Sequence, residues 1–142
     1  MMNTKIYKSV HNLAGELMTA ANKDDQETFD SLYAVLKTIC LTHENTEKDH
    51  PVQWETLADF TEDLNEAITI YQKALAKATA INSKDFMSSI AFAMATLQVE
   101  LGQRDAAIEN LKSAKTNSNK IADKDLKAEI HDLLEELLPS NQ

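Results

Sequence analysis

The sequence has few of the residues that interrupt regular structure. Its 142 residues include only two glycines and two prolines, and aromatic residues make up 6%. Glycine and proline readily end helices and form turns, whereas alanine, leucine, lysine and glutamate, which are common in this chain, favour helices. This composition predicts an all-α protein and speaks against a sheet. With so few glycines, the sequence also offers no glycine-rich loop for binding phosphate.

The single cysteine and the lack of long apolar runs bear on localisation. Cys40 has no second cysteine with which to form an internal disulfide, which fits a reducing compartment. It falls on the apolar stripe of a predicted helix, where we interpret it as a small buried hydrophobe. No apolar run approaches the ~20 residues of a membrane helix, and residues 1–8 have no apolar stretch like that of a signal peptide. We therefore expect a cytoplasmic protein with no membrane partner.

The chain is acidic, and its negative charge is concentrated in the first half. The net charge is -9, and residues 1–72 contain five lysines against thirteen acidic residues. Within residues 44–66, eight acidic side chains face a single lysine. Such a field repels phosphate backbones, so nucleic acid is not an expected partner. Two interpretations stay open: a solvated face that keeps the protein soluble, or an acidic patch containing Glu55, Glu62 and Asp63 that steers a basic partner.

Apolar residues recur at three- and four-residue steps along most of the chain, which places them on one face of a helix. The pattern predicts three helical hairpins over about residues 4–44, 51–81 and 84–118, followed by one helix over about residues 122–138. Turn signals separate the helices: Asp24 or Asp25, Pro51, and the pair Asn82-Ser83. The length fits one domain over residues 1–142.

Residues 51–80 allow two interpretations. Eight apolar residues form an unbroken stripe at helical spacing, which favours one long helix. A helix of that length without caps is unusual, however, and Thr61 is a suitable residue to cap a new helix. We expect a break near residues 60–63.

One sequence pattern occurs at two places in the chain, and the upstream copy is incomplete. Gly102 separates two amphipathic helices and suits the left-handed conformation that ends the first of them. Three residues follow it at the spacing Gly-x-x-x-x-Ala-x-x-x-Leu-x-x-Ala: Ala107, Leu111 and Ala114. This spacing resembles the second half of a tetratricopeptide repeat. An upstream partial copy, offset by 40 residues rather than the usual 34, has Ala67, Tyr71 and Ala74 at the corresponding places. The upstream copy has Glu62 where the glycine would align, and the longer offset suggests lengthened helices.

The resemblance implies a right-handed stack of antiparallel helical hairpins, which the helix over residues 122–138 would cap. In such proteins the first helix of each repeat lines a concave groove that binds a peptide or helix of another protein, without catalysis or a cofactor. The resemblance places five residues toward that groove: Thr56, Asp59, Phe92, Thr96 and Val99. Phe92 and Val99 form a second apolar face, for which packing against a neighbouring helix and a homodimer contact are the alternatives. A structural homo-oligomer is thus a second class of function.

His11 suggests a third class. Val10-His11-Asn12-Leu13-Ala14-Gly15 resembles the phosphorylated-histidine motif His-x-Leu-Lys-Gly of histidine phosphotransfer domains. That chemistry needs an exposed imidazole nitrogen, a small residue four positions later and a nearby cation. His11 and Gly15 supply the first two, but Ala14 stands in place of the lysine. The alternative interpretations are that His11 is only a surface histidine and that Gly15 permits close helix packing.

Potential metal ligands are concentrated near the end of the first hairpin: His43, Glu44, Glu47, Asp49 and His50. Their order lacks the second histidine of a zinc-protease helix, and the polarity of a loop is sufficient to explain them. We expect no metal site here.

Overall fold

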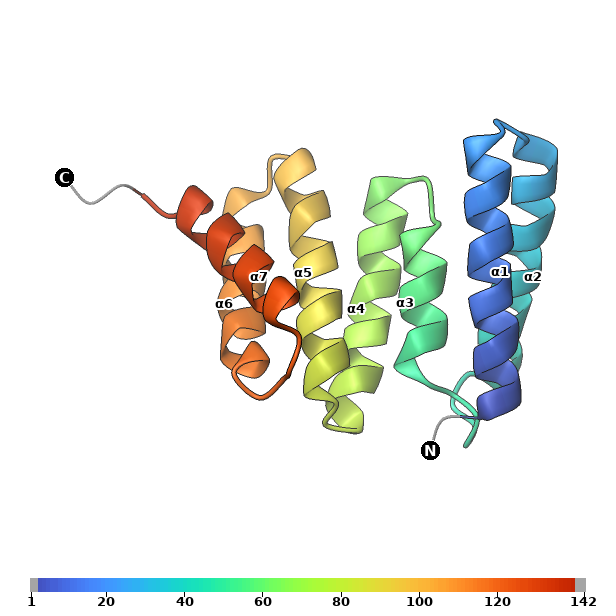
Figure 1. Ribbon diagram of the computed structural model, residues 1–142, viewed down its shortest axis with the longest axis horizontal. Coiled ribbons are helices and arrows are strands. Elements are labelled where there is room, and N and C mark those ends of the chain that lie inside the picture. Colours follow the sequence, from blue (N-terminus) through green and yellow to red (C-terminus); the bar gives the residue numbers. More distant parts are fainter. Residues whose placement is uncertain (1–2, 140–142) are drawn as a thin grey trace. The chain divides into compact units, whose positions relative to one another are not determined.

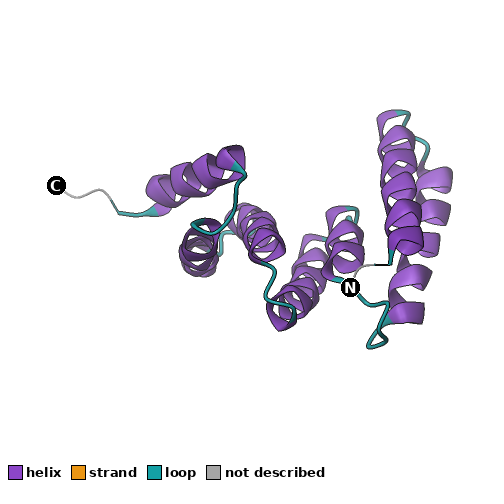
Figure 2. Ribbon diagram, turned by 60° about the horizontal axis from the view of Figure 1, so that its bottom comes forward, coloured by secondary structure: helices purple, strands orange, loops and turns teal. Residues whose placement is uncertain are grey.

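The computed structural model describes residues 3–139, which form seven α-helices and no β-strand (Figure 2). Helices account for 80% of the structure, which confirms the all-α class expected from the composition. Within this range no helix combines the length and the hydropathy that a membrane span requires.

The helices closely match the segments predicted from the sequence (Figure 1). Their bounds are α1 (Thr4–Asn22), α2 (Gln26–His43), α3 (Pro51–Asp59), α4 (Leu64–Ala80), α5 (Lys84–Glu100), α6 (Arg104–Ser118) and α7 (Lys124–Leu137). The chain divides into two compact units, Met1–Ile70 and Tyr71–Gln142, and the division falls within α4. The expectation of one domain over residues 1–142 stays a prediction.

In the first unit, α1 and α2 lie side by side as a hairpin, and α3 contacts both helices (Figure 1). Their inward faces carry the apolar residues of the sequence stripes, and these residues are buried: Val10, Leu13, Leu17, Phe29, Leu36 and Leu57. Cys40 has no exposed surface, and its thiol donates to the Gln53 carbonyl oxygen at 3.2 Å. The interpretation of Cys40 as a buried residue is confirmed.

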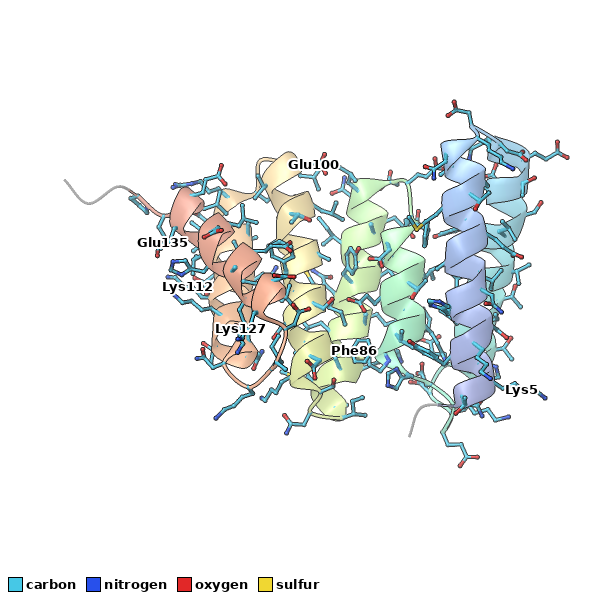
Figure 3. All side chains as sticks on the ribbon, viewed as in Figure 1. Lys5, Phe86, Glu100, Lys112, Lys127 and Glu135 are labelled. Atoms are coloured by element: carbon cyan, nitrogen blue, oxygen red, sulfur yellow. The ribbon has the colours of Figure 1, made fainter. Side chains whose placement is uncertain are left out.

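In the second unit, α5 and α6 pack against each other, and α7 packs against α6. Small side chains make the close approach of α5 and α6 feasible, since larger residues would hold the helices apart. The buried cluster consists of Ala91, Ala95, Ala107, Leu111, Ala114, Ile130 and Leu134. Charged residues such as Lys112 and Glu135 are exposed on the outer surfaces of α6 and α7 (Figure 3). The Arg104 guanidinium also donates to the Leu137 carbonyl at the end of α7.

Three helices end in the same way, each with a residue in the left-handed region. These residues are Asp24, Asn82 and Gly102, with φ of 54°, 53° and 74°. At the end of α5, the Gly102 N–H donates to the Val99 carbonyl at 3.1 Å, and the Gln103 N–H donates to the Gln98 carbonyl at 2.8 Å. This Schellman arrangement satisfies carbonyls that the helix leaves without partners. The predicted left-handed cap at Gly102 is confirmed.

The stripe over residues 51–80 is divided between two helices, as expected, because α3 ends at Asp59 and α4 begins at Leu64. The capping residue differs from the prediction. Thr61 is buried and its hydroxyl donates to the Leu57 carbonyl at 2.8 Å, so it secures the end of α3. Asp63 instead caps α4, and its carboxylate accepts from the Glu66 N–H at 2.9 Å.

The polar loop before α3 is built from internal hydrogen bonds. The Asp49 carboxylate accepts from the Trp54 indole N–H at 2.8 Å and from the Asn45 backbone N–H at 2.8 Å. The His50 ring Nδ1 accepts from the Val52 N–H at 3.1 Å and caps α3, whose first residue is Pro51. Burial lowers the pKa of His50 below its ordinary value of 6.5, against the opposing effect of Asp49.

Candidate interaction surface

The predicted groove residues lie in both units. On α3, Thr56 is half-buried and its hydroxyl donates to the Val52 carbonyl at 2.7 Å, while Asp59 is exposed. On α5, the Thr96 hydroxyl donates to the Ala93 carbonyl at 2.7 Å. The hydroxyls of both threonines are therefore engaged by their own helices.

Phe92 and Val99, the apolar members of the predicted groove, have different surroundings. Phe92 is half-buried and packs against the cluster of α5, α6 and α7, in line with the alternative of packing within the fold. Val99 is 38% exposed and keeps much of its surface available. The groove itself stays a prediction.

The predicted acidic residues have distinct local roles. Glu55 is half-buried on α3, whereas Glu62 and Asp63 are exposed in the connection between α3 and α4. The Glu62 carboxylate accepts from the Gln26 side-chain amide at 3.1 Å, and the same amide donates to the Asp30 carboxylate at 2.7 Å. The neutral Gln26 amide thus bridges the Asp30 and Glu62 carboxylates. No lysine or arginine lines the hollows beside them.

These carboxylates border a hollow with aromatic residues in its walls, which we name the acidic–aromatic hollow. Its volume is about 230 Å³. It is lined by Phe29, Asp30, Tyr33, Phe60, Thr61, Glu62, Asp63 and Glu66. The residues come from α2, the α3–α4 connection and the first turn of α4, and all belong to the first unit.

The aromatic residues of this hollow are held in place by one another and by the end of α3. Phe29 and Phe60 form an edge-to-face pair with ring centroids 6.3 Å apart. The Tyr33 and Thr61 hydroxyls are 2.7 Å apart; because Thr61 donates to Leu57, Tyr33 acts as the donor. Burial raises the pKa of Tyr33, opposed by the bond with Thr61, and the nearby charge of Glu66 raises it further.

A second, smaller hollow adjoins the first and shares Phe29 and Glu62 with it. It has a volume of about 190 Å³ and lies beside the turn between α1 and α2. Its lining is Ala20, Ala21, Asp24, Asp25, Gln26, Phe29 and Glu62. Hydrogen bonds from Thr28 lower the pKa of Asp25, so this carboxylate holds its negative charge firmly.

His11 and Gly15 lie on the surface of α1 beside a broad, open hollow between α1 and α2. His11 is exposed and its ring stacks on Tyr7, with centroids 6.3 Å apart and planes inclined by 16°. Gly15 is also exposed, and a Cβ added there would meet nothing within 4 Å. The idea that Gly15 permits close helix packing is therefore wrong. The lysine that lines the hollow, Lys23, follows His11 by twelve residues, about 18 Å along a helix axis.

The second unit has a hollow of different chemistry, lined by Gln72, Leu75, Ala76, Thr79, Met94, Gln98 and Asn110. Its lining is uncharged, and the Asn110 side-chain amide donates to the side-chain oxygen Oε1 of Gln98 at 2.7 Å. Met94 and Gln98 lie on the side of α5 opposite Phe92, Thr96 and Val99, as the 100° step per residue requires. This hollow is thus on the other face of α5 from the predicted groove residues.

Metal-binding geometry is absent from the part of the chain that the structure describes. No three histidine, cysteine, aspartate or glutamate side chains within residues 3–139 converge on a position for a metal ion. The polar residues near the end of the first hairpin include Asp49 and His50, which hold Trp54 and the start of α3.

Sequence reasoning identified Glu62 and Asp63 but missed the aromatic residues beside them. Phe29 and Tyr33 fall on the apolar face of α2, and Phe60 falls on the apolar stripe of residues 51–80, so helical periodicity alone assigns all three to the core. The signal available was the break at residues 60–63, because Phe60 directly follows the last residue of α3 and is only half-buried.

Comparison of the chain with protein-family models, with curated proteins and with solved structures finds no match in any of the three.

Proposed function

We propose that this protein is a non-enzymatic, tetratricopeptide-like interaction module that binds a basic segment of another protein. The observation that carries the proposal is one burial pattern that recurs 40 residues apart. In α4 the pattern buries Ala67, Tyr71 and Ala74, each no more than 5% exposed. In α6 the same spacing buries three residues with no exposed surface: Ala107, Leu111 and Ala114.

Repetition of small and large buried residues is what a stack of helical hairpins requires. The small residues allow the helices to approach, and the large residue fills the remaining space. A hairpin buries only one side by itself, so repeats must stack, and the terminal one needs a helix with a polar outer face. The α7 helix suits that role because Ile130 and Leu134 are buried while Glu129, Asp132 and Glu136 are exposed. Stacks of this kind function by presenting long surfaces to other proteins.

The charge distribution supports a basic partner. The acidic surplus lies in the first half of the chain, and the two hollows around Phe29 and Glu62 have no lysine or arginine in their linings. Uncompensated carboxylates accelerate the approach of a cationic partner and disfavour an anionic one. In this proposal Thr56 and Asp59, on α3 of the first unit, add contacts to the partner.

Selection from a random peptide library against the immobilised full-length chain tests this function. We expect enriched peptides to be rich in arginine and lysine and to bind in solution with dissociation constants of about 1–100 μM, as for a small, shallow interface. The control is an unrelated helical protein of the same length and net charge. Failure to enrich any peptide above that control would contradict the proposed function. The solution mass of the free protein then tests the homo-oligomer class, for which a stable dimer would be required.

The exposure of His11 and the open space at Gly15 favour histidine phosphotransfer as a second candidate function. A phosphoryl group on His11 would lack a cation at the position of Ala14, and Lys23, which follows the last residue of α1, is too far away to replace it. The test is incubation with phosphoramidate, a direct phosphoryl donor, followed by ³¹P NMR. A phosphohistidine signal that His11→Ala removes would support this candidate, and its absence from the wild type would eliminate it.

A further inference from the structure

We propose that the acidic–aromatic hollow binds one basic side chain of the partner segment and prefers arginine to lysine. This inference rests on the proposed function and names the chemistry that the partner must supply. Its basis is the combination of a hollow of limited size, aromatic walls and an unbalanced set of carboxylates.

The size of the hollow fits one side chain. Sites for small-molecule ligands usually have volumes of about 300–1,000 Å³ and enclose most of the ligand. The acidic–aromatic hollow has about 230 Å³ and opens to solvent. It is therefore suited to one side chain that projects from a larger partner, whose remaining contacts lie outside the hollow.

The aromatic walls favour a cation that has an apolar stem. Tyr33 and Phe60 are half-buried and offer ring surfaces, while the buried Phe29 supports Phe60 edge-to-face at an interplanar angle of 61°. Aromatic faces attract cations and also cover the methylene groups of long basic side chains. A planar guanidinium stacks on such rings better than an ammonium group does, which is the reason to expect arginine.

The carboxylates supply charge complementarity from several elements at once. Asp30 comes from α2, Glu62 from the connection and Glu66 from the first turn of α4, and all three are exposed. The bridge between Asp30 and Glu62 is the neutral Gln26 amide, so their mutual repulsion is not cancelled. A guanidinium presents five N–H donors and can bond to two carboxylates at the same time.

A metal ion does not suit this arrangement. No three histidine, cysteine, aspartate or glutamate side chains of the described residues converge as metal ligands, whereas a guanidinium spreads its donors across a plane and needs no such convergence. The neighbouring hollow continues the acidic lining past Glu62 to Asp24 and Asp25. An extended segment with a second basic residue would pass from one hollow to the other, which favours a peptide over a free amine.

The experiment titrates the full-length protein with fluorescein-labelled peptides in fluorescence anisotropy. The probe is the repeating peptide (Ala-Arg)₃, compared with (Ala-Lys)₃ and with the citrulline analogue, which keeps the shape of arginine without its charge. The test variant combines Asp30→Asn, Glu62→Gln and Glu66→Gln, and it keeps Asp63 because that residue caps α4. The matched control combines Glu109→Gln, Asp132→Asn and Glu135→Gln, three exposed residues of the second unit with the same change in net charge.

We expect the test variant to bind the arginine probe about tenfold more weakly, because exposed ion pairs each contribute little. The control should change binding by no more than about twofold, through net charge alone. The lysine probe should bind about threefold more weakly than the arginine probe, and Phe60→Leu should weaken arginine binding by about threefold through loss of a ring face. Circular dichroism melts show whether Phe60→Leu retains the fold.

Three results would overturn this inference: equal weakening in the test and control variants, equal binding of the citrulline analogue, or arginine binding that the test variant leaves unchanged. If library-selected peptides still bind the protein in any of these cases, the proposed interaction function stands and only the arginine site fails. If no peptide of any composition binds, both proposals fail.

Discussion

The two glycines of the chain should respond to substitution in opposite directions. Gly102 has φ +74°, and Gly15 lies within α1 with ordinary helical geometry; a Cβ added at either position meets nothing within 4 Å. Steric contact between an added Cβ and neighbouring side chains therefore does not affect stability at either site. The difference between them is the backbone conformation alone.

At Gly102 an L-residue must adopt a left-handed conformation that a Cβ disfavours. This conformation costs roughly 1–2 kcal/mol for alanine and more for a β-branched residue. We therefore expect Gly102→Val to lower the free energy of unfolding by about 1–3 kcal/mol. With about 3–4 °C per kcal/mol for a chain of this length, the melting temperature should fall by roughly 3–12 °C. The melting temperature of the Gly102→Asn variant should fall less than that of the valine or alanine variant, because asparagine tolerates the left-handed region.

At Gly15 the same kind of change should stabilise the protein. An exposed glycine inside a helix costs roughly 0.5–1 kcal/mol relative to alanine, so Gly15→Ala should raise the melting temperature by about 2–4 °C. The assay is thermal unfolding followed by circular dichroism at 222 nm, together with urea titrations. A melting temperature that Gly102→Val leaves unchanged, or that Gly15→Ala lowers, would refute this reasoning about the backbone.

Two further predictions concern packing and pH. Ala107→Leu should destabilise the protein by about 1–3 kcal/mol because Ala107 has no exposed surface in the α5–α6 contact, whereas the exposed Ala106 should accept leucine almost freely; equal urea midpoints for the two variants would contradict this. Since the folded pKa of His50 lies below 6.5, the unfolded chain binds a proton first as the pH falls, so stability should drop progressively below about pH 6.5. His50→Asn, which keeps a capping side chain for the Val52 N–H, should show a smaller loss between pH 7.5 and 5.5 in urea titrations.

Most of the helical fold followed from the sequence because its determinants are local. Periodic apolar residues and turn residues such as Asp24 and Asn82 act within one or two helical turns, so the helix bounds agree with the prediction to within a few residues. Even the break at residues 60–63 was recognised, although Asp63 rather than Thr61 caps α4.

The candidate site was less predictable because it depends on contacts between distant segments. Phe29 and Phe60 are 31 positions apart and meet only through the packing of α2 beside the end of α3. A periodicity argument assigns Phe92 to a spare apolar face, yet it packs against its own unit's cluster. Helical periodicity gives the direction of a side chain but not what lies opposite it, so the acidic residues were found while the aromatic walls were not.

The central claim is that a basic partner segment binds the acidic first unit without any chemistry at His11. The most direct measurement is a binding isotherm for the highest-affinity library-selected peptide at 50 and 300 mM salt. It compares the wild type with His11→Ala and with a variant that neutralises Glu55, Asp59 and Glu62 but keeps Asp63, because that residue caps α4. We predict that salt and the acidic variant weaken binding by about tenfold each, since exposed charges are screened beyond about 10 Å at 0.1 M, and that His11→Ala has no effect. Binding that is independent of salt and survives the acidic changes, or binding that His11→Ala abolishes, would contradict the account.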